Sequence, residues 1–265
     1  MSDLKILVTV KLVPDTSADK RIDPASKRLV RTGVETVLNP FDEFAIEAGL
    51  QLKENIGADA TVTVVTMAPE SGKEIVRKAL AMGADDAIMI CDPKAEGSDV
   101  WGTAYTLAQA IKTRGFDLVL CGTQSTDSIT GELPGALAEF LGVPGVTNVR
   151  KLELDGTTVR AERETDNGYA KVVADLPLLV SVTKSINQPR YPSLKGIMGA
   201  KKKTILIQTL ADAGVEKPVG NEGARTELTD LATPAARGKG EVFEAADAVA
   251  GAAKIIEFLR ERKLV

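Results

Sequence analysis

Residues 118–131 read Leu-Val-Leu-Cys-Gly-Thr-Gln-Ser-Thr-Asp-Ser-Ile-Thr-Gly, an apolar run that gives way to a polar loop. The run over residues 118–121 is short and wholly apolar, which is typical of a strand buried on both faces of a sheet. Apolar residues at helical spacing over 133–141 predict a helix directly after the loop. A strand, a loop and a helix in this order form the repeating unit of parallel sheets.

The same unit recurs on the N-terminal side of this stretch. Strand-like apolar runs lie at residues 6–10, 62–67 and 87–90. Apolar stripes predict helices over residues 41–52 and 100–111, with Asn39 and Ser98 as their expected N-caps. Strands that alternate with helices of this length predict an α/β fold with a doubly wound, mostly parallel, Rossmann-like sheet.

The rhythm changes on the C-terminal side. Residues 149–154 and 158–163 flank Asp155-Gly156, a pattern typical of an antiparallel hairpin with a tight turn. Two more extended segments follow at residues 170–176 and 179–184. We expect these added strands to extend the same sheet, because no change of composition separates them from it.

The remainder of the chain predicts an arm. Residues 1–209 form the expected nucleotide-binding domain, and residues 210–240, rich in Gly, Pro, Thr and Ala, predict an extended linker. Residues 241–265 contain a helix with one apolar face, which a single tethered helix cannot bury alone. Docking of this helix on a partner subunit and docking on its own domain both agree with the pattern.

Composition excludes several classes of function. The chain has 265 residues, no histidine, two cysteines (Cys91 and Cys121) and a net charge of −4. Without histidine there is no Ser-His-Asp triad, and no carboxylate pair stands out for acid–base work, so we assign no catalytic residue and expect no enzyme. The two cysteines lack metal-binding spacing, so we expect no metal site. The acidic balance argues against a nucleic-acid partner, and the strand-length apolar runs predict no membrane insertion and a cytoplasmic protein.

The loop over residues 122–131 is the first candidate site. Its glycines let backbone amides approach an anion, the following helix start favours negative charge, and Asp127 suits hydrogen bonds from ribose hydroxyls. Three more loops meet it at the carboxyl ends of parallel strands, at residues 11–16, 39–40 and 67–69. The pattern suits a phosphate-bearing nucleotide, and equally a polar turn with a helix cap; it is neither a Walker loop nor a GxGxxG fingerprint.

The second candidate site is a basic stretch in an acidic chain. Residues 184–203 contain six cations and no acidic residue: Lys184, Arg190, Lys195, Lys201, Lys202 and Lys203. Apolar side chains lie among them, namely Tyr191, Leu194, Ile197 and Met198. Charge that steers an encounter and an apolar anchor that contributes contact energy are features of a transient protein contact. A solvated lysine face is the alternative interpretation.

Several short motifs follow one another in a fixed order along residues 4–208. They are Val8–Lys11, Val13–Thr16, Asn39–Asp42, Lys78–Asp85, Gln124–Asp127, Glu162–Asp166, Pro189–Leu194 and Ile197–Lys203. Taken together, these motifs resemble the beta subunit of the electron transfer flavoproteins.

The resemblance implies an electron-carrier subunit. In that family the alpha subunit holds the redox FAD, and the beta subunit binds AMP, or a second FAD in the bifurcating members. The heterodimer carries electrons from dehydrogenases such as acyl-CoA dehydrogenases to a quinone oxidoreductase and the membrane quinone pool. Electron transfer between flavins needs no side-chain acid or base here, which agrees with the missing histidine.

The resemblance also assigns residues. The family's nucleotide contacts correspond to Thr9, Asn39, Met67, Gly122, Asp127, Ser128, Ile129, Thr130, Gly131, Glu132 and Leu133. Its recognition loop for the dehydrogenase corresponds to residues 191–200, with Leu194 as the apolar anchor and Tyr191, Ile197 and Met198 around it. Glu164 matches an acidic residue that faces an arginine of the mobile flavin domain.

The choice between AMP and FAD depends on two loops. Ile129 stands where the family commonly has an acidic residue, and Pro134 where it has glycine. Val13–Thr16 and Asp23-Pro24 resemble the bifurcating members, whose longer first loop covers a flavin. We expect AMP, because residues 128–131 depart from the flavin-binding pattern. A stand-alone ATP-binding regulatory protein is the alternative of another class, but it would space its glycines differently and leaves the C-terminal tether unexplained.

Overall fold

The computed structural model describes residues 4–18, 20–57, 59–230, 232, 235, 238, 240, 242–244 and 246–265. The chain divides into a large unit, Met1–Thr229, and a small unit, Asp230–Val265. Much of the predicted linker, between residues 231 and 241, lies outside the described residues.

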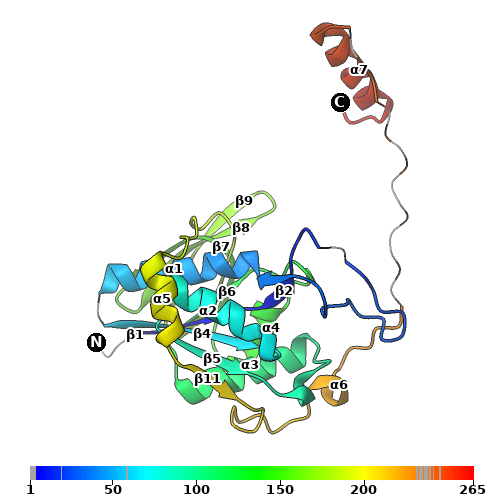
Figure 1. Ribbon diagram of the computed structural model, residues 1–265. Coiled ribbons are helices and arrows are strands. Elements are labelled where there is room, and N and C mark those ends of the chain that lie inside the picture. Colours follow the sequence, from blue (N-terminus) through cyan, green and yellow to red (C-terminus); the bar gives the residue numbers. More distant parts are fainter. Residues whose placement is uncertain are drawn as a thin grey trace. The chain divides into compact units, whose positions relative to one another are not determined.

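A nine-stranded sheet forms the centre of the large unit, in the order β11-β5-β4-β1-β6-β10-β7-β8-β9 (Figure 1). Its strands are β1 (Leu4–Thr9), β4 (Ala60–Met67), β5 (Asp86–Ile90), β6 (Leu118–Gly122), β7 (Gly145–Asp155), β8 (Thr158–Thr165), β9 (Gly168–Asp175), β10 (Leu178–Val182) and β11 (Ile205–Gln208). Neighbours from β11 to β7 are parallel, whereas β8 and β9 are antiparallel. The predicted doubly wound sheet with an antiparallel extension is confirmed.

Helices cover both faces of this sheet. They are α1 (Pro40–Ile56), α2 (Lys73–Met82), α3 (Val100–Arg114), α4 (Leu133–Leu141) and α5 (Leu194–Lys202), with the short turns η1 (Glu70–Gly72), η2 (Pro93–Ala95) and α6 (Gly220–Gly223). Ile6 and Val8 of β1 are fully buried in the core beneath α1 and α2, and Leu7 between them lies in the core beneath α3 and α4. This alternation follows from the two-residue period of a strand, and it explains why apolar residues predominate on both faces of the central strands.

Two strands differ from the sequence prediction. The segment predicted at 179–184 is β10, which lies inside the sheet between β6 and β7 and does not extend its edge. All five residues of β10 are buried, Ser181 included, as expected for a strand that is covered on both faces. The edge strand β11 was not predicted, although Ile205-Leu206-Ile207 is a β-branched apolar run.

Of the two predicted helix N-caps, Ser98 is wrong, and Asn39 is correct in position but not in its hydrogen bond. Asp99, not Ser98, caps α3, because its carboxylate accepts a hydrogen bond from Gly102 N at 2.8 Å. The Ser98 hydroxyl instead accepts from Gly220 N at 2.8 Å. Asn39 occupies the N-cap position of α1, but its side chain makes no capping bond.

Part of the predicted linker packs on the large unit. Leu210, Ala213 and Val219 are buried in the core beneath α3. Asp99 also accepts hydrogen bonds from the backbone of Arg225 and Thr226. Residues 210–229 therefore belong to the large unit, because they supply apolar side chains to its core.

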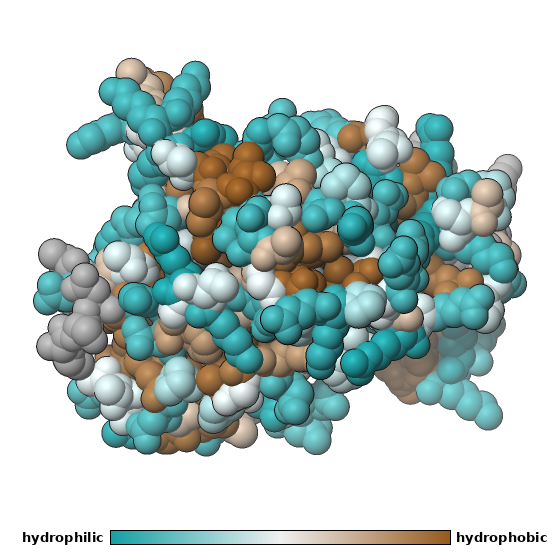
Figure 2. Space-filling model, turned by 90° about the horizontal axis from the view of Figure 1, so that it is seen from below, coloured by the Kyte–Doolittle hydropathy of each residue, from teal (hydrophilic) through white to brown (hydrophobic). Residues whose placement is uncertain are grey.

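One helix, α7 (Ala248–Glu261), lies in the small unit, with Asp247 as its N-cap. No residue of α7 is buried, and its apolar side chains Val249, Ile255 and Phe258 are exposed. Among the described residues, no helix is both long and apolar enough to cross a membrane. In Figure 2, hydrophilic side chains cover much of the face seen, and apolar atoms show in patches between them.

A small antiparallel ribbon lies outside the main sheet. It pairs β2 (Leu12–Pro14) with β3 (Thr36–Leu38), so that residues 15–35 form one excursion between them. The ribbon leads directly from β1 to the start of α1, and it places the excursion near the carboxyl edge of the sheet. This edge holds the candidate site.

Candidate functional site

The order of the strands reverses between β1 and β6. From β1 the chain builds the sheet in one direction through β4 and β5, and then crosses to β6 on the other side of β1. The ends of β1 and β6, at Thr9 and Gly122, are therefore neighbours from which the chain departs in opposite directions. Open parallel sheets bind their ligands in the crevice at such a reversal.

Gly122 brings the candidate loop close to the start of α1. A Cβ atom at this position would lie 2.6 Å from Asp42 Oδ1 and 2.8 Å from the Phe41 carbonyl carbon. No side chain fits there without displacing backbone. The nucleotide loop, defined here as residues 122–133, consequently begins in direct contact with the first turn of α1.

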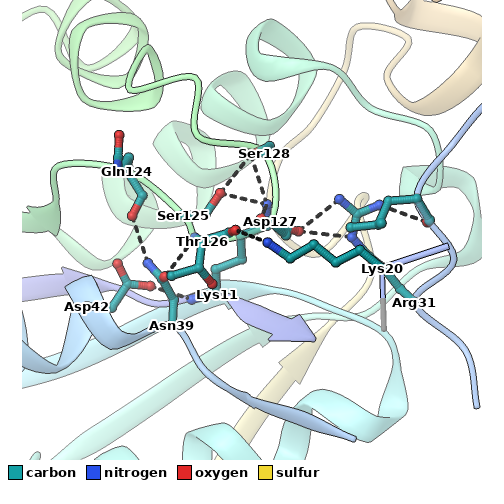
Figure 3. A network of polar contacts seen from close by, with 11 residues as sticks. Lys11, Lys20, Arg31, Asn39, Asp42, Gln124, Ser125, Thr126, Asp127 and Ser128 are labelled. Atoms are coloured by element: carbon teal, nitrogen blue, oxygen red, sulfur yellow. Dashed lines mark hydrogen bonds and ion pairs between the residues drawn. The ribbon is translucent and has the colours of Figure 1, made fainter. Parts of the chain in front are cut away.

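Asn39 joins the same two elements by hydrogen bonds. Its Nδ2 donates to the Gln124 carbonyl oxygen at 2.9 Å, and its Oδ1 accepts from Thr126 N at 3.2 Å (Figure 3). The side chain is buried, so these bonds satisfy it where water cannot. The predicted cap at Asn39 thus has another role, because its amide holds the nucleotide loop.

Asp42 is a buried carboxyl beneath this loop. It accepts a hydrogen bond from Lys11 N at 2.8 Å. Burial raises the pKa of Asp42 to about 7, and hydrogen bonds from Asn39 and Lys11 oppose the rise only in part. The foot of the site therefore contains a carboxyl group that titrates near neutral pH.

Asp127 is held by two cations. Lys11 Nζ lies 2.7 Å from its Oδ1, and Arg31 Nη2 lies 2.8 Å from its Oδ2 (Figure 3). Only 1% of the Asp127 side chain is exposed. Burial alone would raise the pKa of Asp127, but Lys11, Ser125 and Arg31 hold it well below its usual range. In the described structure this carboxylate binds cations of the protein, so its predicted role toward a ribose stays a prediction.

The second half of the loop leaves hydrogen-bond donors open. Ile129 and Gly131 have φ angles of 53° and 66°, and Ile129 is exposed. The N-cap residue of α4, Glu132, makes no side-chain capping bond. Among the described residues, no protein acceptor is recorded for the backbone N–H groups of residues 130–133. A β-branched residue with positive φ is strained, and four free donors at a helix start favour an anion.

The buried hydroxyl of Thr126 independently supports a ligand site at this loop. Thr126 Oγ1 is buried and has no hydrogen-bond partner among the described residues. A buried polar atom without a partner costs about 1–3 kcal/mol, so it favours a ligand that supplies one. Open donors, an unpaired hydroxyl and the nearby cations Lys11, Lys20 and Arg31 together fit a phosphate-bearing group.

The predicted residues divide into two sets. The structure brings Asn39, Gly122 and the run from Asp127 to Leu133 together around one loop. Thr9 and Met67 end the adjacent strands β1 and β4, where Thr9 is buried and Met67 also packs on the core beneath α3. Sequence reasoning missed Lys20 and Arg31 and gave Lys11 no role in the site. Their only signal is positive charge in an aperiodic loop.

The second candidate site lies on α5. Tyr191 is 94% exposed and Leu194 is 76% exposed, while Ile197 and Met198 are also exposed. Ser193 caps the helix by accepting a hydrogen bond from Gly196 N at 3.0 Å. Two of the six predicted cations have partners inside the protein, because Arg190 pairs with Glu47 and Lys203 donates to the Ala84 carbonyl. The charge available for steering belongs to Lys184, Lys195, Lys201 and Lys202.

Glu164 lies on β8 of the antiparallel extension. Its Oε1 accepts a hydrogen bond from Thr183 Oγ1 at 3.2 Å. This contact holds Glu164 beside the end of β10.

A family model described as the electron transfer flavoprotein domain matches residues 27–213. The chain is 40% identical to electron transfer flavoprotein subunit beta of Mycobacterium tuberculosis, over 98% of this chain and 99% of that protein. It is 38% identical to the same subunit of Megasphaera elsdenii, over 92% and 93% of the two chains. It is 36% identical to caffeyl-CoA reductase-Etf complex subunit CarD of Acetobacterium woodii, over 99% and 100%.

Proposed function

The chain belongs to the electron transfer flavoprotein family as a beta subunit, and from this we propose that it binds AMP in its nucleotide loop while a partner alpha subunit holds the FAD. The observation that supports it is a set of donors without a partner among the described residues, namely the Thr126 hydroxyl and the backbone N–H groups of residues 130–133. A nucleoside monophosphate is a polyanion that these donors can bind. The FAD supplies the electron-accepting chemistry, and this chain supplies position and contacts.

Each part of the nucleotide loop has a proposed role. The N–H groups of residues 130–133 and the Thr126 hydroxyl would bind phosphate or ribose oxygens. Asn39 keeps the loop in place through its two hydrogen bonds. Lys11, Lys20 and Arg31 outnumber the carboxylates of Asp127 and Glu132, and Asp42 is only partly ionised near neutral pH, which leaves the site a small net positive charge that favours a phosphate.

The docking segment, defined here as residues 191–200, would receive the electron donor. We propose that Leu194 is its apolar anchor, with Tyr191, Ile197 and Met198 around it, and that the donor is a flavin dehydrogenase of the acyl-CoA dehydrogenase class. Electrons would leave through a quinone oxidoreductase to the quinone pool. Exposed apolar side chains beside free lysines suit a contact that forms and dissociates at each turnover.

The remaining parts of the chain would contact the alpha subunit in the cytoplasm. We propose that α7 docks there through its exposed apolar face, at the end of a linker that starts after residue 229. Glu164 would face an arginine of the alpha subunit's flavin domain. An amphipathic helix with no buried residue gains most by burying that face on another chain.

A second FAD in place of AMP is the second candidate. The residue 15–35 excursion favours it, because Arg31 and Lys20 bring this excursion onto the nucleotide loop. A longer first loop is the feature in which this chain resembles bifurcating members. One relative also bears the name of a caffeyl-CoA reductase-Etf complex subunit.

Counting cofactors separates these alternatives. The chain is co-expressed with an alpha subunit, the heterodimer is acid-extracted, and FAD and AMP are quantified. One FAD and one AMP per heterodimer support the proposal, and two FAD support the second candidate. A colourless homodimer that binds ATP would overturn both.

Two variants test the two sites separately. Thr126→Val keeps the shape of the side chain and removes only the buried hydroxyl, so we expect loss of AMP with FAD retained. Leu194→Ala should slow reduction by a dehydrogenase about tenfold while the flavin spectrum and AMP content stay unchanged. Normal reduction kinetics in Leu194→Ala would remove the docking assignment.

A further inference from the structure

Arg190 stands immediately before the docking segment and is bound by two carboxylates of α1. Its Nε lies 2.7 Å from Glu47 Oε2, and its Nη2 lies 3.0 Å from both Glu47 Oε1 and Glu54 Oε2. The Nη1 group bonds Glu54 Oε1 at 2.5 Å, and the backbone N–H of Arg190 donates to Glu47 Oε2 at 3.2 Å. The guanidinium is thus held in a plane by two acceptor pairs, which lysine could not reproduce.

The partners differ in burial. The Glu47 side chain is only 5% exposed, whereas that of Glu54 is 57% exposed. The two glutamates are seven residues apart on α1, so they lie on one face of the helix, two turns apart. Asn187 adds a third attachment, because its Nδ2 donates to the Phe44 carbonyl at 3.0 Å. Residues 187–190 are therefore fixed along α1.

The other end of the docking segment is fixed on α2. Gly196 lies so close to the end of α2 that a Cβ atom would be 2.3 Å from the Ala81 carbonyl oxygen. Arg77 donates to the Ala200 carbonyl at 2.5 Å. Between these attachments, Tyr191 and Leu194 project into solvent. The segment is bound at both ends and exposed in the middle.

From this arrangement we propose that the Arg190–Glu47–Glu54 clamp is the positioning device of the docking segment; the inference rests on the proposed docking function. The clamp orders the segment before the donor arrives. Ordering a flexible segment during association weakens binding, so a pre-ordered segment binds more tightly with the same contacts. Arg190 is a positioning residue that acts through Leu194 and Tyr191.

The charges of the clamp permit a sharp test. Arg190→Ala makes the surface more negative, and Glu47→Gln makes it more positive. If the clamp acted by steering a charged donor, the two variants would change association in opposite directions. If it acts by positioning, both variants weaken docking.

The experiment uses the heterodimer and an acyl-CoA dehydrogenase reduced by its acyl-CoA. We expect kcat/KM for reduction of the heterodimer to fall about tenfold in Arg190→Ala and Glu47→Gln, and about threefold in Glu54→Gln, mainly through KM. Arg190→Lys should recover only part of the loss. The matched control is Lys53→Met. Lys53 lies on the same helix as Glu47 and Glu54, and the variant breaks its ion pair with Asp85, so kcat/KM should stay unchanged.

Leu194→Ala and the double variant Arg190→Ala/Leu194→Ala distinguish failure of the docking function from failure of the clamp. Full activity in Leu194→Ala overturns the docking function itself. If Leu194→Ala lowers kcat/KM but Arg190→Ala and Glu47→Gln leave it normal, the clamp proposal alone is overturned. It is also overturned if Arg190→Ala and Glu47→Gln change kcat/KM in opposite directions. In the Arg190→Ala background, Leu194→Ala should cost less than it does in the wild-type chain; strict additivity also contradicts the proposal. Should Arg190→Ala fail to assemble, Glu54→Gln carries the test, because its carboxylate is largely solvated.

Discussion

The nucleotide loop and the docking segment leave the sheet side by side, yet they are built in opposite ways. Gly122 at the end of β6 is the register partner of Val182 at the end of β10. From Gly122 the chain enters a network of buried polar groups around Asn39 and Asp127. From Val182 the chain reaches α1 and α2, where polar clamps hold it and an apolar tip remains exposed.

This difference separates two uses of polar contacts. In the nucleotide loop, the bonds of Asn39 and Asp127 hold the backbone in place, while the N–H groups of residues 130–133 have no acceptor among the described residues. Next to the docking segment, the bonds of Arg190 go to Glu47 and Glu54, while Leu194 stays exposed. A ligand bound for long periods suits the first arrangement, whereas a partner that must dissociate quickly suits the second.

The largest expected effect concerns the close approach at Gly122. Gly122→Ala places a methyl group within 2.8 Å of Phe41 backbone and Asp42 in the core, so we expect the free energy of unfolding to fall by about 3 kcal/mol. Urea unfolding of the purified chain measures it. Gly135→Ala is the matched control, because its Cβ would meet nothing within 4 Å and lies in α4. Equal stability of the two variants would contradict this account of the loop.

The second prediction concerns pH and the buried Asp42. Since its pKa is raised from 3.8 to about 7, the folded state binds the proton more tightly than the unfolded state. The stabilisation is fully present below pH 3.8 and is lost as pH rises through about 7, so stability should fall by about 2.5 kcal/mol from pH 5 to pH 8. The chain has no histidine to add a slope in this range. In Asp42→Asn the slope should vanish; an unchanged slope would show that another group titrates.

The sequence predicts the local backbone features of the nucleotide loop, but not the contacts between residues that are distant in the sequence. The strand at 118–121 and the loop after it were predicted correctly, because apolar runs and glycines report local backbone preferences. The contact of Arg31 with Asp127 joins residues 96 positions apart, and no local periodicity encodes it. Sequence rules for capping also failed at Asn39, where tertiary hydrogen bonds replace the local one.

The same limit applies to the docking segment. Its exposed apolar residues were predicted from their setting among lysines. The sequence alone gave Arg190 and Lys203 the same role as the other cations, whereas the structure pairs both with groups on α1 and after α2. Arg190 is a clamp and not a steering charge because its partner Glu47 is buried. Burial of Glu47 results from the packing of segments that are distant in the sequence, so the sequence does not reveal it. The central place of β10 was missed for the same reason, since an apolar run indicates burial but not strand order.

A smaller effect is expected at the second close glycine. Gly196→Ala meets the Ala81 carbonyl oxygen, but α5 lies at the surface and can move away, so we expect a loss of stability of about 1–2 kcal/mol. Displacement of α5 should also lower kcat/KM with the dehydrogenase several-fold while AMP content stays constant. Gly199→Ala, on the same helix with nothing within 4 Å, should be as stable as wild type or slightly more so. An AMP loss in Gly196→Ala would show that the two regions are not independent.

The smallest effect belongs to solvated lysines within and just after the docking segment. Lys195 and Lys202 are exposed, and the structure records no ionic partner for them among the described residues, so their charge acts at long range. The double variant Lys195→Gln/Lys202→Gln should lower kcat/KM about threefold at low salt and not at all near 0.5 M salt, where the screening length falls to roughly 4 Å. Lys94→Gln/Lys112→Gln removes the same charge from exposed positions on the other side of the molecule, and should change kcat/KM much less at either salt concentration.

Because the clamp variants lose contact geometry and not long-range attraction, their deficit should persist at 0.5 M salt. If the deficits of the clamp variants and the lysine variants both disappear at high salt, the docking segment acts only through its charge. It would then differ from the nucleotide loop in charge alone, and not in how its polar contacts are used.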